Sequence, residues 1–366
     1  MTLVYHLFCF AVPMVILSWI LPKKYVLQSQ IICTGLFIVY ESPLSFGLLT
    51  FITIGNFYLL HHTKLKQNLK IGISLLFLSL LLLTIKITIA LEQNWVVPLG
   101  ISYYAFRNIH YTLEFFKGKI KNPNVLFYLG YNFFLPVFIV GPINRYADFV
   151  KDWQRRRFNQ DYFSDGLQRI LYGLSKIVIL GNYLFTFKAK LFIKNLDPSD
   201  IWLQNYLETI RFVLNAYFQF AGYSDIAIGL SLLMGYRITE NFNYPFLTTN
   251  MRDFWTKYHI SLSSFCKDYI YTPISSYYRR PLLGIGITMI VIAMWHEISM
   301  RYLIWGILQA LAISAGSFFQ QIPKNLVSTF LGRLFVLHFF ACSAVIISHE
   351  SLASAFETYK ILFLIS

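Results

Sequence analysis

The chain has 366 residues, of which 56% are hydrophobic and 13% are charged, and its net charge is +14. A soluble globular domain carries about 25% charged residues, so this composition excludes an ordinary soluble domain and indicates an integral membrane protein. The positive charge does not indicate nucleic-acid binding, because the basic residues cluster between apolar segments without an aromatic-interleaved groove or a glycine-rich phosphate loop. Loops rich in Lys and Arg are typical of the cytoplasmic side of a membrane, beside anionic lipid.

Apolar segments recur along the whole chain, and several reach or approach the ~20 residues that a membrane-spanning helix needs. They show no strict alternation, so we expect helices and not a barrel, the two structures that satisfy their backbone in lipid. The Lys23-Lys24 pair follows the first segment, which indicates a retained helix and not a cleaved signal. In chain order the predicted apolar helices cover Leu3–Leu21, Ile31–Tyr40, Ser45–Leu60, Ile71–Leu91, Val125–Ile143, Ile170–Phe185, Phe212–Tyr236, Leu282–Met294, Tyr302–Phe319 and Leu331–Ile347.

Two more polar segments are predicted to lie at the membrane surface. Arg145–Gly166 mixes aromatic with basic residues, as cytoplasmic segments at the headgroup level do. Asn250–Ile270 places apolar residues at three- and four-residue steps, which indicates an amphipathic helix too polar to span, with Pro245 before it and Pro273 after it. No linker, low-complexity tract or clear repeat interrupts the chain, so residues 1–366 are predicted to form a single domain.

Two histidines are the best candidates for chemistry. His296 follows the apolar stretch Ile285–Met294, where an ionisable side chain is expensive and is usually functional or paired. His259 is expected on the amphipathic helix. Each also has a structural reading, since a histidine at a helix end often bonds a carbonyl, and nothing in the residues alone separates these two from the other six: His6, His61, His62, His110, His338 and His349.

The neighbouring residues exclude several kinds of site. The four cysteines are scattered, and no Cys or carboxylate lies at ligand spacing from either histidine, so no metal and no bound cofactor are expected. No Gly-x-Ser-x-Gly motif accompanies the serines near His259, which disfavours a covalent serine mechanism. A buried base without its own nucleophile suits direct transfer, in which the base takes a proton from an acceptor hydroxyl that attacks the donor.

Several local strings, in order between about residues 95 and 310, resemble the membrane-bound O-acyltransferase (MBOAT) family, and most of all its bacterial alginate O-acetyltransferase-like branch. His296 lies in one of these strings, Met294-Trp295-His296, and Leu303-Ile-Trp305-Gly306 follows it. The remaining strings are Leu99–Phe106, Phe134–Pro136 with Gly141–Tyr146, Gly222-Tyr-Ser-Asp225-Ile-Ala-Ile-Gly229, Glu240-Asn-Phe-Asn-Tyr-Pro-Phe246, Phe254-Trp-Thr-Lys-Tyr-His259-Ile-Ser-Leu-Ser263 and Asp268–Pro273.

The resemblance implies an all-α polytopic membrane protein, in which a ring of tilted helices surrounds a central tunnel and short helices lie at the interface. It implies that His296 is the essential base within that tunnel, that His259 is the second signature residue, and that Asn241 lies near the cytoplasmic entrance. The remaining candidates for contact with substrate or tunnel are Asn243, Trp255, Tyr258, Trp295 and Glu297.

By the same resemblance the donor is acetyl-CoA or another acyl thioester, free or on an acyl carrier protein. The acceptor is a hydroxyl of an extracytoplasmic polysaccharide or cell-envelope glycan, reached directly or through a secreted or periplasmic acetyltransferase partner. The protein is expected in the bacterial inner membrane, in contact with lipid. Two alternatives stay open: D-alanyl transfer to teichoic acid, which Gly222-Tyr-Ser-Asp225 disfavours, and a non-catalytic transporter or scaffold.

Three departures from the branch bear on activity. Glu297 stands where Gly is usual, and it either raises the pKa of the adjacent histidine, narrows the tunnel, or pairs with Arg301 four residues on. Gln309 stands where many relatives carry another histidine, which makes a relay role doubtful. The chain is also short for this branch.

Overall fold

The computed structural model describes residues 2–90, 98–319 and 325–365. These residues are helical or in loops, apart from one isolated antiparallel bridge between Phe242 and Tyr258, which confirms the predicted all-α class. The chain divides into two compact units. Unit 1 comprises Met1–Tyr172 with Ser224–Thr239, and unit 2 comprises Gly173–Tyr223 with Glu240–Ser366.

In the described part of the chain, five helices are long and apolar enough to cross a membrane, which confirms a multi-pass membrane protein. Two shorter apolar helices, α14 (Pro281–His296) and α15 (Met300–Phe319), accompany them. The five lie in α1 (Thr2–Ile20), α3 (Pro43–His61), α4 (Gln67–Ala90), the continuous helical segment Gln160–Lys194, and α16 (Leu326–Ser348).

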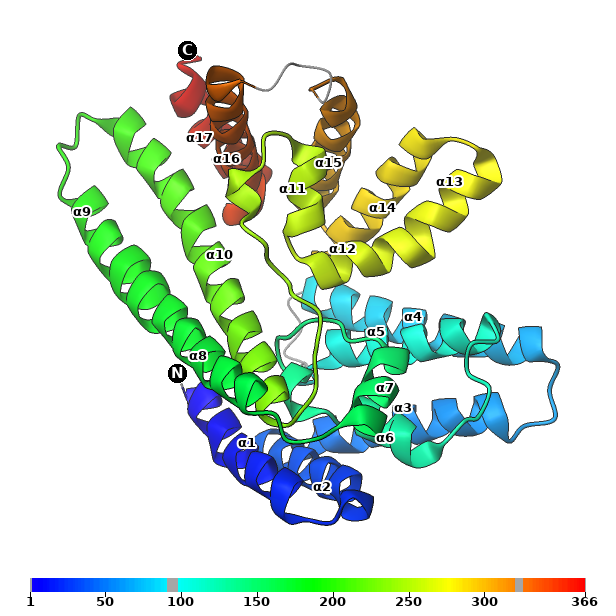
Figure 1. Cartoon of the computed structure of the whole chain (residues 1–366). Coiled ribbons are helices and arrows are strands. Elements are labelled where there is room, and N and C mark those ends of the chain that lie inside the picture. Colours follow the sequence, from blue (N-terminus) through cyan, green and yellow to red (C-terminus); the bar gives the residue numbers. More distant parts are fainter. Residues whose placement is uncertain (1, 91–97, 320–324, 366) are drawn as a thin grey trace. The chain divides into compact units, whose positions relative to one another are not determined.

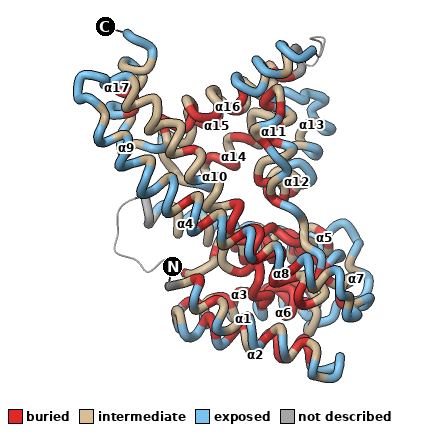
Figure 2. The backbone as a smooth tube through the Cα atoms, turned by 60° about the vertical axis from the view of Figure 1, so that its left-hand side comes forward, coloured by how far each residue is buried: buried red, intermediate tan, exposed pale blue. Residues whose placement is uncertain are grey.

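Unit 1 is built on packed helices whose buried residues concentrate where α3, α5 and α6 meet (Figures 1 and 2). Aromatic residues dominate this core, and Tyr104, Tyr111 and Tyr131 are fully buried. Besides α1, α3 and α4, unit 1 contains α2 (Lys23–Glu41), α5 (Ile101–Phe116), α6 (Val125–Asn132), the 3-10 turn η1 (Leu135–Val137), α7 (Tyr146–Arg155) and most of α8 (Gln160–Ser175).

The centre of unit 1 holds a group of buried polar side chains that we call the polar core. Asn56 donates to the Tyr128 hydroxyl (3.0 Å), and Ser74 donates to the Asn56 side-chain oxygen (2.6 Å). Asn108 donates to the Asn132 side-chain oxygen (3.1 Å). Such bonds join helices where the hydrophobic effect between them is weak. The polar core consists of Asn56, Ser74, Asn108, Thr112, Tyr128 and Asn132, from α3, α4, α5 and α6.

The predicted apolar helix over Val125–Ile143 is wrong as a continuous element. The chain leaves α6 at Asn132, and Pro136 lies in the short turn that follows. The buried guanidinium of Arg107 lies against this break, donating to the carbonyls of Tyr131 (3.0 Å), Asn132 (2.8 Å) and Val137 (2.8 Å). Because the guanidinium supplies donors to three backbone carbonyls at this break, the helix can end inside an apolar core.

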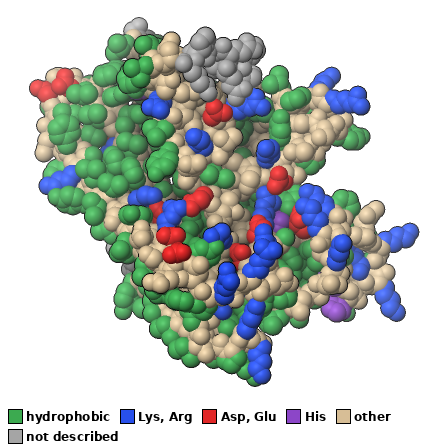
Figure 3. All heavy atoms as spheres, viewed as in Figure 1, with side chains coloured by type: hydrophobic (Ala, Val, Ile, Leu, Met, Phe, Trp, Pro, Cys, Tyr) green, Lys and Arg blue, Asp and Glu red, His purple; other side chains and the backbone are tan. Residues whose placement is uncertain are grey.

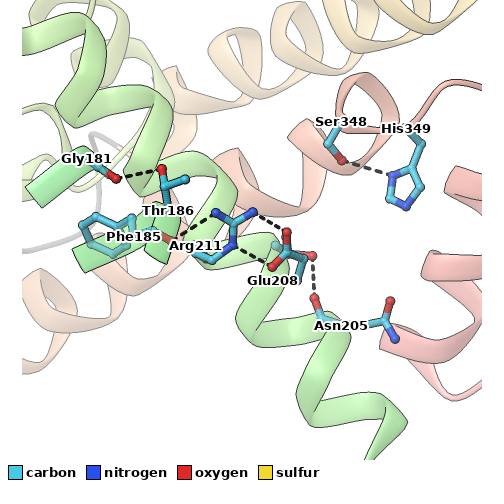
Figure 4. Close-up of polar contacts among 9 residues, drawn as sticks. Gly181, Phe185, Thr186, Asn205, Glu208, Arg211, Ser348 and His349 are labelled. Atoms are coloured by element: carbon cyan, nitrogen blue, oxygen red, sulfur yellow. Dashed lines mark hydrogen bonds and ion pairs between the residues drawn. The ribbon is translucent and has the colours of Figure 1, made fainter. Parts of the chain in front are cut away.

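Unit 2 contains residues 173–223 and the C-terminal helices. Residues 176–189 are π-helical, and Arg211 of α10 donates to the Phe185 carbonyl (3.2 Å) while it pairs with Glu208 (Figure 4). Besides α14, α15 and α16, unit 2 contains η2 (Lys176–Ala189), α9 (Lys190–Lys194), most of α10 (Ile201–Leu233), η3 (Pro245–Leu247), α11 (Met251–Lys257), α12 (Ile260–Cys266), η4 (Lys267–Tyr271), α13 (Thr272–Tyr278) and α17 (Leu352–Phe363).

Candidate active site

The helix predicted over Asn250–Ile270 is interrupted at its most interesting residue. The chain forms α11 up to Lys257 and begins α12 at Ile260, and His259 lies between them with φ +47° and ψ +51°. The prediction that His259 rides on a helix is therefore wrong. A residue other than glycine pays a steric cost in this left-handed conformation, so surrounding contacts have to hold it there.

The contacts that hold the break come from the segment around Asn241. The Ile260 N–H donates to the Asn241 carbonyl (2.9 Å), and the Ser261 hydroxyl donates to the Asn241 side-chain oxygen (2.6 Å). The Asn243 N–H donates to the Lys257 carbonyl (3.0 Å). Buried Asn241 and exposed Asn243 thus act through hydrogen bonds that fix the backbone on both sides of His259.

His259 is buried, with 4% of its surface exposed, and is walled by aromatic rings. Phe220 meets it edge-on with ring centroids 4.7 Å apart, and the Trp295 ring lies 6.4 Å away. Its Nε2 atom is buried and has no hydrogen-bond partner among the described residues. Burial lowers the pKa of His259, and the neighbouring His296 lowers it further, so the imidazole is neutral near pH 7.

His296 is the last residue of α14, and it is exposed. The expectation of a buried base is therefore wrong for the residue itself, because the apolar segment ends there and the chain turns into α15. The imidazole packs against Trp295 (centroids 4.5 Å), stacks on Tyr302 (5.9 Å) and meets the Trp305 ring edge-on (6.2 Å). We call His259, Trp295, His296, Tyr302 and Trp305 the histidine cluster, since Trp295 contacts both imidazoles.

Trp305 is a residue of this cluster that the sequence analysis did not single out as a site candidate. It is 4% exposed, and its Nε1 is buried without a hydrogen-bond partner among the described residues. Tryptophan N–H groups in a protein interior usually find an acceptor. An indole donor held unsatisfied beside an exposed imidazole is suited to a ligand oxygen. The available signal was its place in the string Leu303–Gly306.

Gln309, which stands where a further histidine was considered, has a structural partner on each side. It is fully buried, accepts from Trp255 Nε1 (3.2 Å) and donates to the Ser343 hydroxyl (2.8 Å). These two hydrogen bonds orient Trp255, whose ring centroid lies 6.1 Å from that of Trp305. Gln309 therefore supports the wall behind the histidine cluster.

Tyr258 and Glu297, two of the predicted site candidates, are both adjacent in sequence to histidines of the cluster but make structural contacts of different kinds. Tyr258 is stacked on Phe254 (centroids 5.0 Å) and packs against Phe340 (5.2 Å), as part of the aromatic core below His259. Glu297 caps the end of α14 and forms an ion pair with Arg301 (2.8 Å), so the pairing considered in the sequence is present.

The arrangement offers an accessible imidazole, a second, buried imidazole, and an unsatisfied indole donor. No three His, Cys, Asp or Glu side chains among residues 2–90, 98–319 and 325–365 lie together as a metal site would require. The groups present suit proton transfer at His296 and hydrogen bonding to an oxygen that gains negative charge.

The chain is similar to several known proteins. Residues 42–355 match the model of the membrane-bound O-acyltransferase family. A probable alginate O-acetylase, AlgI, of Pseudomonas aeruginosa is 32% identical over 285 residues, which cover 73% of this chain and 52% of that protein. A teichoic acid D-alanyltransferase of Bacillus subtilis is 30% identical over 270 residues, 68% of this chain and 67% of that protein.

A peptidoglycan O-acetyltransferase of Helicobacter pylori is 25% identical over 299 residues, which cover 72% of this chain and 56% of the relative. The chain spans about half the length of the alginate O-acetylases that it matches. All three relatives act on a glycan or an envelope polymer, as their names state.

Proposed function

The chain belongs to the membrane-bound O-acyltransferase family, and from this premise we propose that it transfers an acyl group, acetyl in the first instance, to a hydroxyl of an extracytoplasmic polysaccharide or cell-envelope glycan. The family match confirms the resemblance drawn from the sequence, and the alginate O-acetylases support the same branch. The proposed donor is a cytoplasmic thioester, acetyl-CoA or an acyl carrier protein, and the proposed location is the bacterial inner membrane.

One structural observation carries this proposal: the histidine cluster. It places an exposed imidazole at the end of an apolar helix, one tryptophan away from a buried imidazole. Among its buried nitrogens, Nε2 of His259 and Nε1 of Trp305 have no hydrogen-bond partner among the described residues. Unsatisfied buried polar atoms cost free energy, so a ligand that satisfies these two nitrogens would be stabilised here, which supports the proposal.

In the proposed reaction His296 takes the proton of the acceptor hydroxyl as its oxygen attacks the thioester carbonyl. A carbon–oxygen bond forms, and the carbonyl oxygen gains the negative charge, which Trp305 Nε1–H stabilises. The carbon–sulfur bond then breaks, and the departing thiolate receives the proton from His296. Loss of one preorganised donor to such an oxyanion typically lowers the rate about 10²-fold to 10³-fold.

His259 is proposed to position the reaction and not to carry the proton. Its depressed pKa keeps it neutral, so it offers one hydrogen-bond donor or one acceptor at Nε2. Asn241, through Ile260 and Ser261, fixes the backbone that aims this ring. A partner protein that carries the acyl group onward from the membrane belongs to the proposal as well.

A second candidate is D-alanyl transfer to teichoic acid. The match to the Bacillus subtilis D-alanyltransferase covers 67% of that protein, a larger share than the 52% covered in the Pseudomonas aeruginosa alginate O-acetylase. The string Gly222-Tyr-Ser-Asp225 favours the acetyl branch. The two candidates share the histidine cluster and differ in the acyl group delivered.

The test is a deletion strain of the source organism complemented with wild type, His296→Ala or His62→Ala. His62 is an exposed histidine of unit 1 outside the cluster and serves as the matched control. Acetate and D-alanine released from envelope glycans by mild base are measured against protein level in the membrane. Loss of a general base lowers transfer about 10²-fold or more.

We expect acetate to return with wild type and His62→Ala and to stay absent with His296→Ala. Recovery of D-alanine in place of acetate would select the second candidate. Full recovery of ester with His296→Ala at normal protein level would overturn a catalytic role and leave a transporter or scaffold.

A further inference from the structure

A second concentration of charged side chains lies in unit 1. The end of α7, the start of α8 and the segment after Ser224 enclose a cavity of about 320 Å³. Five basic side chains and one acidic side chain line it, and Figure 3 shows Lys and Arg gathered on this face. The lining residues are Lys151, Asp152, Arg155, Arg156, Arg157, Asn159, Tyr162, Gly235 and Arg237.

The wall of this cavity is held in place by hydrogen bonds. Arg156 donates from Nε to the Met234 carbonyl (2.6 Å) and from a terminal nitrogen to the Ser18 carbonyl, and its guanidinium stacks 3.9 Å above the Trp19 ring. Gly235, with φ +81°, lies so close that an added Cβ would be 3.1 Å from Arg156 Cγ. Arg156 is therefore a fixed part of the wall.

The opposite wall is fixed in the same manner. The Arg237 N–H donates to Asp152 Oδ2 (2.8 Å), and the Arg237 guanidinium lies 4.2 Å above the Tyr162 ring. The single acidic residue of the cavity is thus engaged by the backbone. Stacking on a ring pre-orders an Arg side chain, which lowers the entropic cost of binding an anion.

The remaining basic groups form no ion pair among the described residues, and Lys151 lies within electrostatic range of Asp152. Among the described residues no ion pair or side-chain hydrogen bond engages the guanidinium of Arg155 or Arg157, or the ammonium of Lys151. All three are exposed at the cavity. Like charges that line one cavity repel each other, so a multiply charged anion would stabilise this arrangement.

We propose that this basic cavity binds a phosphate-bearing group. Guanidinium forks match phosphate oxygens in pairs, and the cavity volume is at the lower end of small-molecule sites. Two sources share this chemistry: the phosphorylated carrier of an acyl thioester, an assignment that rests on the proposed function, and the headgroup of an anionic phospholipid. Phosphate binding itself does not depend on acyl transfer.

The test compares full-length wild type with Arg155→Gln/Arg157→Gln. The matched control is Lys64→Gln/Lys66→Gln, which removes two exposed charges from a different loop of unit 1. In one arm the purified protein in neutral detergent is titrated with pyrophosphate and with coenzyme A by calorimetry. In the other, protein in phosphatidylcholine nanodiscs containing phosphatidylglycerol is analysed by native mass spectrometry for retained anionic lipid.

Loss of two charge-assisted contacts is expected to weaken binding at least about tenfold in the Arg variant and not in the Lys control. A loss confined to pyrophosphate and coenzyme A assigns the carrier, and a loss confined to phosphatidylglycerol assigns the lipid. Equal behaviour of wild type and Arg variant in both arms would overturn the proposal. His296→Ala should bind pyrophosphate as tightly as wild type does. Phosphate binding at the cavity can therefore be confirmed even if His296 proves to have no role in acyl transfer.

Discussion

The polar core of unit 1 and the histidine cluster of unit 2 are both groups of polar and aromatic side chains among apolar helices, but they differ in how their hydrogen bonds are satisfied. In the polar core, Asn56 reaches Tyr128 and Ser74, and Asn108 reaches Asn132. In the histidine cluster, His259 Nε2 and Trp305 Nε1 are buried without partners.

This difference separates two uses of polarity in an apolar protein. A satisfied group stabilises the helices that it joins, and its loss is felt as stability. An unsatisfied group costs stability in the resting protein and gains its partner from a ligand. Mutations in the two regions are therefore expected to divide between unfolding and loss of transfer.

The largest effect is expected at Arg107, which serves the satisfied region. Arg107→Met leaves the carbonyls of Tyr131, Asn132 and Val137 buried without a donor, at a cost on the order of 3 kcal/mol or more. Thermal unfolding of the purified protein measures it. The melting temperature of Arg107→Lys should lie between those of wild type and Arg107→Met, since an ammonium lacks the planar arrangement of donors that a guanidinium has. If Arg107→Met melted at the wild-type temperature, the satisfied hydrogen bonds of unit 1 would not be what stabilises it, and the contrast with the histidine cluster would fail.

One substitution made in both units, at a satisfied and at an unsatisfied indole, sharpens the comparison further. Trp305→Phe removes an indole donor that has no partner, so transfer should fall about 10²-fold while hydrogen bonding in the resting protein is unchanged. Trp19→Phe removes a donor bonded to the Leu233 carbonyl (2.7 Å), so stability should fall by about 1 kcal/mol and transfer should persist. The same loss of transfer in both variants would contradict the distinction.

A smaller effect concerns stability in acid, tested at a buried histidine of unit 1. Burial lowers the pKa of His110 from 6.5 to about 3, with help from the positive charges of Arg145, Lys119 and Lys117, and its Nε2 accepts the Tyr146 N–H (3.0 Å). Between these pH values the unfolded chain binds a proton that the folded chain excludes, so stability is lost as the pH falls from 6.5 towards 3.

His110→Gln should therefore flatten the fall in melting temperature over that interval and leave transfer at neutral pH near wild type. His259→Gln should lower transfer at neutral pH. An unchanged acid response in His110→Gln would show that other groups govern it.

The smallest effect is expected at Glu297. Its pair with Arg301 is partly exposed, so Glu297→Gly should lower stability by at most about 1 kcal/mol, and Arg301→Gln should match it. Both variants should show the same pH dependence of acyl transfer as wild type. A profile displaced only by Glu297→Gly would mean that the acid tunes His296.

Sequence patterning was sufficient for helices that are long and apolar enough to cross a membrane. The segments Leu3–Leu21 and Ser45–Leu60 lie within α1 and α3 almost to their ends, because a uniformly apolar run of spanning length has few alternatives. Val125–Ile143 failed because its break is stabilised from another helix, by Arg107, and such a contact leaves no trace in local composition.

The histidines show the same limit within the site. Motif resemblance selected His259 and His296, and their assignment as site residues stays a prediction. The break at His259 depends on Asn241, eighteen positions earlier, and an amphipathic pattern cannot reveal such a partner. Trp305 was missed because an unsatisfied nitrogen is a property of the folded surroundings.

The positive φ at His259 limits which side chains this position can accept during evolution or in a designed library. Side chains branched at Cβ are excluded by the backbone before their chemistry matters, whereas Asn and Gly adopt φ +47° most readily. Inactive Asn or Gly variants that accumulate normally would therefore report on the imidazole, and failed Val or Ile variants would report on conformation.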